Sequence, residues 1–260
     1  MQKQAWIHSM TAVGLGAVCV LLRWLQNMNA FEPETGLIVP GHTLSILLAL
    51  ALMGSAVGLW GLNRTLRFAS ASDDPEKAMG ETPLPLTAVM VSGGIIAIGG
   101  AVLYYFTGVG IVPKMTALLG LFSVSALLLF PYLNRWGGFG AFLSLFPVAF
   151  FSTWLVVAYR DYARDPVLWN YAPLMLAISG SLYAVYRLAA YFFYRAQPTK
   201  VVYACALATV LNMTVLMDTA IGAGRLILGG WAVGFAAIIG MLILNMSEVL
   251  PEYDVEDEYE

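Results

Sequence analysis

Eight apolar stretches, each long enough to cross a lipid bilayer, make up most of this 260-residue sequence. A membrane-spanning helix needs about 20 mainly apolar residues, which matches the length of these stretches. Charged residues amount to only 11% of the chain, against roughly 25% in an average soluble domain, so lipid is the expected solvent. The predicted spans lie near residues 5–25, 43–62, 86–107, 114–133, 139–159, 172–193, 201–218 and 226–246.

This pattern predicts an all-α integral membrane protein with about eight transmembrane helices in one bundle. A membrane β-barrel would show alternating segments of about 10 residues, whereas these stretches are continuously apolar. The transmembrane domain is expected to cover residues 1–247. Residues 248–260 form an acidic cytoplasmic tail that holds seven of the sixteen acidic residues and no Lys or Arg. Such a run is typical of a solvated, disordered end, and docking of a basic protein partner is the alternative.

The distribution of basic residues predicts the orientation of the chain. With eight spans, both termini share one side, and that side carries seven basic residues against five on the other. The positive-inside rule then favours cytoplasmic termini in a cell membrane, either plasma or inner. The side of the termini holds Lys3, Arg64, Arg67, Lys77, Arg135, Arg195 and Lys200, and the opposite side holds Arg23, Lys114, Arg160, Arg164 and Arg225.

The fourth and eighth spans resemble each other and suggest an internal duplication. Lys114 matches Arg225 at one end of the two spans, and Leu133-Asn134 matches Leu244-Asn245 at the other. Four plus four spans would form a parallel repeat, related by an axis along the membrane normal. Chance similarity between apolar helices is the alternative explanation.

Arg187 is the clearest charged residue inside a predicted span. A charge at the middle of a bilayer costs at least ~2.5 kcal/mol on insertion scales, so an ionisable residue there is by default a candidate site. Tyr183 and Tyr186 share a broad sector of the same predicted helix. The functional interpretation is a cavity wall in which Arg187 contacts an anion or carboxylate. The structural interpretation is an interior arginine paired to a carboxylate or to helix-end carbonyls.

The seventh span carries Thr209, Asn212 and Asp218. Asparagine within a membrane usually hydrogen-bonds to another helix, so adhesion between helices is the structural interpretation of Asn212. Asp218 lies near the predicted outer end, where water or Arg225 is its expected partner. At greater depth it would be the best proton or cation carrier in the chain. The candidate substrate-binding residues are therefore Arg187, Tyr183, Asn212, Thr209 and Asp218.

The connection 160–171 combines charges with a proline, in the run Arg160-Asp161-Tyr162-Ala163-Arg164-Asp165-Pro166. Interfacial salt bridges, such as one between Asp161 and Arg164, are the structural interpretation. A patch that grips a ligand is the alternative. The residue before a proline is pushed out of the helical region, so the next helix is expected to start after Asp165.

Proline and glycine indicate how the helices are shaped. Pro147 lies inside the fifth span, where it removes a backbone hydrogen bond and is expected to kink the helix. Gly230 and Gly234 form a G-x-x-x-G pair that permits close approach of another helix. Packing within the chain is the structural interpretation of this pair, and homodimerisation is the alternative.

The sequence contains no motif for catalysis, metal binding or nucleotide binding. His8 and His42 lie far apart and outside any H-E-x-x-H context, and no P-loop is present. An isoelectric point near 5.4 without a basic stripe excludes a nucleic-acid partner. The sequence therefore predicts no cofactor and no metal site, and nothing in it supports an enzyme.

Translocation of a small solute or ion, either alone or as the membrane subunit of a transport complex, is the favoured function. It rests on the many spans, the small soluble mass, the glycine-rich helices and the polar residues within spans. The expected partners are the lipid bilayer and a small-molecule or ion substrate. The alternative is a non-catalytic scaffold or sensor that binds a protein partner through its loops, above all 63–85, and through its acidic tail.

Overall fold

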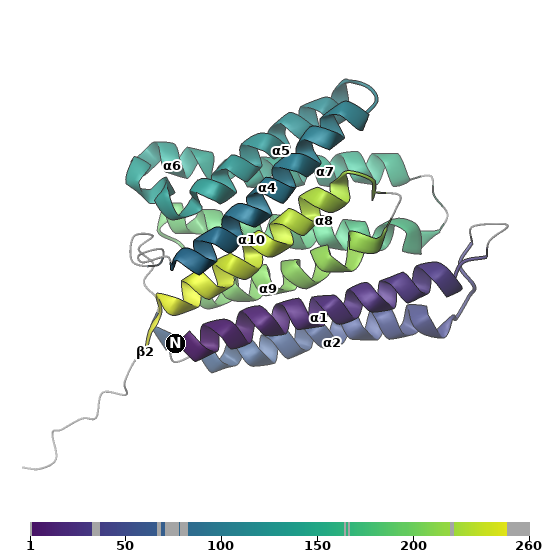
Figure 1. The fold of residues 1–260 in the computed structure, drawn as a ribbon, viewed down its shortest axis with the longest axis horizontal. Helices are drawn as coiled ribbons and strands as arrows, with labels where there is room; N and C mark the ends of the chain where they lie inside the picture. The colour runs from purple at the N-terminus through teal and green to yellow at the C-terminus, as the bar shows by residue number, and fades with distance from the viewer. Residues whose placement is uncertain are drawn as a thin grey trace, which may run out of the picture.

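The computed structural model describes residues 2–32, 37–66, 69–70, 78, 83–163, 165, 167–218 and 221–248. Within these residues the chain is a bundle of helices, eight of which are long and apolar enough to cross a membrane (Figure 1). The predicted all-α bundle is therefore confirmed. The long helices are α1 (Gln2–Asn29), α2 (Thr43–Asn63), α4 (Leu84–Thr107), α5 (Ile111–Leu129), α7 (Leu145–Tyr162), α8 (Leu168–Ala189), α9 (Pro198–Thr214) and α10 (Gly224–Leu244).

Shorter elements lie at the ends of these helices. They are the helix α6 (Gly137–Leu143), the 3-10 helices η1 (Arg64–Leu66), η2 (Phe130–Trp136), η3 (Ala190–Phe193) and η4 (Val215–Met217), and the strands β1 (Ala69–Ser70) and β2 (Ser247–Glu248). The N-terminus and β2 lie at the same end of the bundle, which we name the proximal end (Figure 1). The distal end is the opposite one, where α1, α7 and η4 finish.

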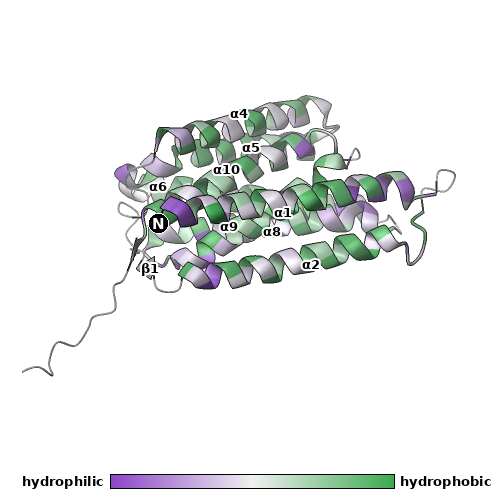
Figure 2. Ribbon diagram, turned by 60° about the horizontal axis from the view of Figure 1, so that its bottom comes forward, coloured by the Kyte–Doolittle hydropathy of each residue, from purple (hydrophilic) through white to green (hydrophobic). Residues whose placement is uncertain are grey.

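Helix α10 forms the centre of the bundle. It is the most buried of the eight long helices, and it packs against α1, α4 and α9. Helices α1 and α2 are the least buried, and their outward faces are mostly hydrophobic, with the polar segments lying mainly near the helix ends (Figure 2). Large apolar side chains such as Leu21, Ile95 and Val156 are more than half exposed. Lipid suits such a surface, because soluble proteins rarely expose contiguous apolar patches of this extent.

Small residues allow the backbones of α4 and α10 to touch. A Cβ atom built on Gly93 would lie 2.6 Å from the carbonyl oxygen of Gly230, and one built on Gly234 would lie 2.8 Å from a methyl carbon of Leu127. The G-x-x-x-G pair of α10 thus packs against α4 and α5 of its own chain, as the structural interpretation expected. Close approach of this kind strengthens dispersion contacts between helices that share an apolar solvent.

A single turn residue, Ser144, separates two helices in the fifth span, three residues before Pro147. Helix α6 ends at Leu143, Ser144 forms a turn, and α7 starts at Leu145. Pro147 has no N–H to donate to the carbonyl of Leu143, four residues earlier, so the helix cannot run through this point regularly. The predicted range 139–159 lies within the candidate membrane span Gly137–Tyr162, which consists of the consecutive helices Gly137–Leu143 and Leu145–Tyr162.

The predicted duplication is matched by some of the helix contacts and not by others. In a repeat of four plus four spans, α7 corresponds to α1, α8 to α2 and α10 to α5. Helix α1 packs against α2 and α10, and α7 packs against the corresponding helices, α8 and α5. Helix α9 packs against α1, α2, α8 and α10, whereas its counterpart α4 packs mainly against α5 and α10. The parallel repeat of four plus four spans stays a prediction.

The proximal end joins parts of the chain that lie far apart in sequence. Strand β1 pairs in antiparallel fashion with β2, so that Ala69 faces Glu248. Asn245 Nδ2, just beyond α10, donates to the carbonyl of Ala78 at 3.2 Å. Most of the predicted loop 63–85, and the acidic tail from residue 249 onward, lie outside the described residues.

Neighbouring glycines on α4 provide a test of the close α4–α10 contact. An alanine Cβ at Gly100 would lie 2.6 Å from the backbone nitrogen of Ile227, whereas Gly99 has nothing within 4 Å. We expect Gly100→Ala to lower the free energy of unfolding in detergent by about 1–3 kcal/mol, the usual cost of overpacking. The matched control Gly99→Ala should leave it unchanged or raise it slightly. Equal effects of the two substitutions would argue against this packing.

Candidate functional site

A salt bridge between Arg23 of α1 and Asp218, the residue after η4, lies buried at the distal end. Arg23 Nε donates to Asp218 Oδ1 at 2.7 Å, and the two side chains are only 3% and 5% exposed. A buried ion pair is favourable only when further hydrogen bonds satisfy the rest of each charged group. The remaining polar groups around Arg23 supply these bonds.

One of these bonds ends on a backbone carbonyl that a proline leaves free. Arg23 Nη2 donates to the carbonyl oxygen of Trp169, in the first turn of α8, at 2.9 Å. In a regular helix this carbonyl would accept from the N–H four residues later, but that residue is Pro173, which has no N–H. The arginine therefore satisfies an acceptor that the helix itself cannot.

Gln26 and Asn27, one turn further along α1, extend the network. Arg23 Nη1 donates to Gln26 Oε1 at 2.7 Å, and Gln26 Nε2 donates to Ser45 Oγ in the first turn of α2 at 2.9 Å. Because arginine can only donate, it fixes the orientation of the Gln26 amide. Asn27 Nδ2 donates to Asp218 Oδ1 at 3.0 Å. The network thus joins α1, α2, α8 and the segment that follows α9.

The ion pair forms part of the wall of an open pocket of about 520 Å³. Pockets for small molecules commonly measure about 300–1,000 Å³, so this one has the size of a ligand site. Its wall comes from the end of α1, the end of α7, the start of α8 and the segment around η4. The lining residues are Arg23, Trp24, Asn27, Met28, Phe31, Tyr162, Asp165, Asn170, Met217 and Asp218.

Asp218 keeps one carboxylate oxygen without a hydrogen bond. Its Oδ1 accepts the bonds described above, whereas Oδ2 is buried and has no partner. The other carboxylate of the wall, Asp165, uses both oxygens at the start of α8, where they accept from Val167 N at 2.8 Å and from Asn170 Nδ2 at 3.0 Å. A buried polar group without a partner costs about 1–3 kcal/mol. Asp218 Oδ2 is therefore the group of this wall that most needs a donor.

Arg187 and Tyr183 lie away from this pocket, toward the proximal end of α8. Arg187 is in the last turn of α8, and its Nε donates to the Tyr183 hydroxyl at 3.1 Å. Its guanidinium carbon lies 5.1 Å from the centre of the Tyr183 ring, which itself is 38% exposed. A cation is favourable at a helix C-terminus and over an aromatic face. Arg187 thus has an outward-facing tyrosine as its partner, where the structural interpretation expected a carboxylate or a helix-end carbonyl.

Thr209 and Asn212 are fully buried and contact different neighbours. Ser181 Oγ of α8 donates to Asn212 Oδ1 at 2.9 Å, and Thr209 Oγ1 donates to the carbonyl of Cys205 at 2.9 Å. Asn212 therefore ties α9 to α8, as the structural interpretation expected, while its Nδ2 has no partner. Of the five predicted substrate-binding residues, Asp218 alone lines the pocket at the distal end.

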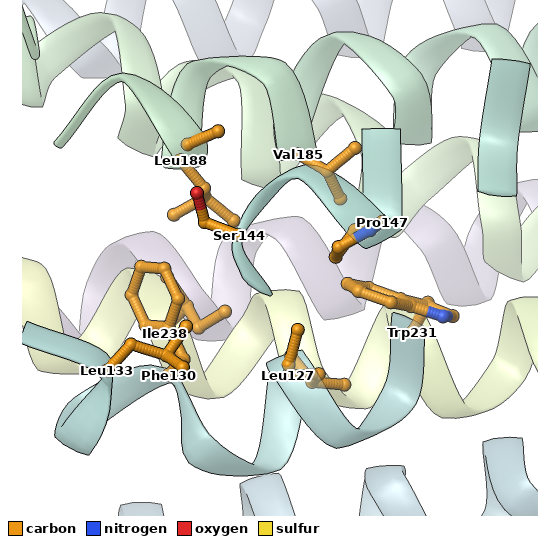
Figure 3. A pocket seen from close by; sticks show the side chains of 11 residues that line it. Leu127, Phe130, Leu133, Ser144, Pro147, Val185, Leu188, Trp231 and Ile238 are labelled. Atoms are coloured by element: carbon orange, nitrogen blue, oxygen red, sulfur yellow. The ribbon is translucent and has the colours of Figure 1, made fainter. Parts of the chain in front are cut away.

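A second cavity, among α5, α7, α8 and α10, is far smaller. It measures about 20 Å³ and is lined mainly by apolar side chains, with Pro147 and Trp231 close together at one side (Figure 3). This is room for about one water molecule. The two cavities share no lining residue, so the pocket at the distal end is the better candidate site.

The partner of Asp218 differs from the one expected from the sequence. From the sequence, Arg23 was counted among the basic residues on the side opposite the termini, and water or Arg225 was the expected partner of Asp218. In the structure Arg23 is the buried partner of Asp218, whereas Arg225 Nε donates to the carbonyl of Gly222. Arg23 and Gln26 are three residues apart on one helix face, and this pattern was the available signal for a polar cluster.

No protein-family model, no curated protein and no solved structure matches this chain. The described residues contain no group of three or more His, Cys, Asp or Glu side chains that could hold a metal ion.

Removing one charge of the buried pair should lower the free energy of unfolding far more than removing both charges. We expect Arg23→Met to lower the free energy of unfolding by about 3–5 kcal/mol, because it leaves Asp218 buried without its cation. The double substitution Arg23→Met with Asp218→Leu should recover most of this loss. Arg160→Met, which breaks a pair with Asp161 whose side chains are 59% and 47% exposed, should cost about 1 kcal/mol or less. Denaturation of the purified protein in detergent measures all three, and similar costs for Arg23→Met and Arg160→Met would contradict the burial.

Proposed function

We propose that this protein transports a small polar solute, alone or as the membrane subunit of a transport complex, and that the solute binds at the pocket of the distal end. The observation that carries the proposal is a buried ion pair on the wall of a ligand-sized pocket, in a bundle with eight apolar helices. Charged residues within membrane helices are costly, and they commonly mark substrate or ion pathways. A purely structural bundle would gain as much from apolar side chains at these positions.

The polar groups of α9 suggest how a solute would continue from the pocket. Asn212 and Thr209 lie further along this helix, away from Asp218, and Asn212 Nδ2 is a buried donor without a partner. We therefore include Asn212 and Thr209 in the proposed path. Helix packing separates these residues from the pocket in this conformation, so passage requires a second conformation, as in alternating access. Contact of the substrate with Arg187 and Tyr183 stays a prediction.

The proposed orientation places the termini in the cytoplasm and the pocket outside the cell, so that the pocket serves uptake. Both native cysteines, Cys19 and Cys205, are buried, so an introduced cysteine can be labelled selectively. We expect a membrane-impermeant maleimide to label Val39→Cys in intact cells and to label Gln2→Cys only after permeabilisation, since both positions are exposed. Labelling of Gln2→Cys alone in intact cells would reverse the topology and make export the expected direction.

Uptake into proteoliposomes tests transport itself. The assay would use radiolabelled amines, amino acids, carboxylates and sugars, and we expect at least one class to accumulate. Met28→Trp should reduce that uptake by roughly tenfold, equivalent to 1.4 kcal/mol, because Met28 lines the pocket and is 63% exposed. The matched control Met10→Trp, on the same helix and 57% exposed, should not change uptake. Absence of uptake for every class, in protein that remains folded, would contradict transport.

A scaffold or sensor is the second candidate, and the proximal end favours it. The pairing of β1 with β2 and the bond from Asn245 to Ala78 hold the connection after α2 against the end of α10. A partner could therefore bind both segments at one surface. Deletion of residues 249–260 separates the two functions, since a transporter should keep its uptake, whereas a scaffold should lose a partner that docks on the tail.

A further inference from the structure

We infer that the pocket at the distal end binds a protonated organic amine, with Asp218 as the acceptor for its N–H groups and aromatic side chains around its carbon skeleton. The inference rests on the proposed function in that it takes this pocket as the solute site. It goes further by assigning the charge and the shape of the ligand.

The charge of the wall favours a cation. Among the described lining residues there are two carboxylates and one guanidinium, which together carry one net negative charge. The side chain of Arg23 is only 3% exposed, and its guanidinium is already bonded to Asp218, Gln26 and the Trp169 carbonyl. Asp218 therefore neutralises the one positive charge, and the carboxylate of Asp165 is the excess charge that a cationic ligand would balance.

The hydrogen bonds of the wall favour a ligand that donates. Asp218 is 5% exposed, lines the pocket, and has an Oδ2 without a partner. A carboxylate oxygen can only accept, so a donor is the group that would satisfy it. A primary ammonium offers three N–H groups, and such charge-assisted bonds are about twice as strong as neutral ones. A quaternary ammonium has the same charge but no donor.

The remaining lining favours an organic ligand over a bare metal ion. Trp24, Phe31 and Tyr162 contribute aromatic rings, and Met28 and Met217 contribute flexible apolar side chains. A cation over an aromatic face gains about 0.5–1 kcal/mol at exposed sites and more when it is desolvated. Hydrated inorganic cations would leave most of this apolar wall unused. The aromatic rings and the free carboxylate oxygen together fit a small amine that carries an apolar group.

A set of matched probes tests this inference on the full chain in lipid nanodiscs by isothermal titration calorimetry. The probes are phenethylammonium, its trimethylated quaternary analogue, neutral 2-phenylethanol, anionic 3-phenylpropanoate and zwitterionic phenylalanine. We expect phenethylammonium to bind at least about tenfold more tightly than the quaternary, neutral and anionic probes, since one charge-assisted hydrogen bond is worth at least a factor of ten. It should also bind more tightly than phenylalanine, whose own carboxylate is repelled by a negatively charged wall. Sodium chloride, added at the same ionic strength as the probe solution, should not displace bound phenethylammonium.

Two substitutions locate the binding. Asp218→Asn should weaken binding of phenethylammonium by about tenfold or more. Because this change also affects the pair with Arg23, Trp24→Ala provides a second test outside the ion pair. Trp24 lies in the pocket and is 46% exposed, and Trp6, on the same helix and 51% exposed, lies at the opposite end. Trp24→Ala should weaken binding severalfold, and the control Trp6→Ala should not change it.

The outcomes distinguish the inference from the proposed function. One result would be that another probe binds more tightly than phenethylammonium and loses this binding in Trp24→Ala. That result would contradict a protonated amine as the ligand, and so overturn the inference, but it would leave the pocket as the solute site. Binding of phenethylammonium that responds equally to Trp6→Ala and Trp24→Ala, or displacement by sodium, would also overturn it. Binding as expected without uptake of phenethylammonium into proteoliposomes would support the inference and count against transport.

Discussion

The buried bond between Arg23 and Asp218 determines how the distal end is assembled. An arginine inside an apolar bundle must have its charge and its donors satisfied, and here the partners come from three places, α1 itself, α8 and the segment after α9. Moving any of these elements alone would leave a charge or a carbonyl buried without a partner, at a cost of several kcal/mol. The positions of α1, α8 and the segment after α9 relative to one another therefore depend on this network, and so does the shape of the pocket.

The rest of the bundle is held in a different way. Around α10 the contacts are apolar and close, and glycines bring the backbone of α4 against it. Such packing allows few other arrangements of the helices, because the interior is dense and a single added methyl group lowers stability. A closely packed core beside a polar, open end is the arrangement expected when one part of a membrane protein provides rigidity and another part binds a ligand.

The fold was predictable from the sequence to the level of helices, and the site was not. Long apolar stretches indicate spans directly, and Pro147 indicated where the fifth span is distorted, since both are local effects. The connection 160–171 was recognised as either salt bridges or a ligand patch, and Asp165 does line the pocket. The burial of Arg23 was not predicted, because its environment is set by α8 and the segment after α9, and one sequence contains no record of which helices meet. Arg187 lies well inside a predicted apolar span, which made it a candidate site. Which face of α8 is exposed depends on how the helices pack, and the sequence does not record this.

The separation of the two charged partners along the chain has a consequence for how the protein is made. Arg23 and Asp218 are 195 residues apart, so α1 is synthesised long before the carboxylate that neutralises it. Until then the guanidinium must remain near water or lipid headgroups, as long basic side chains at helix ends can. The docking of α1 onto α8 and α9 is consequently a late event in assembly, and the pocket does not exist until nearly the whole chain has been synthesised.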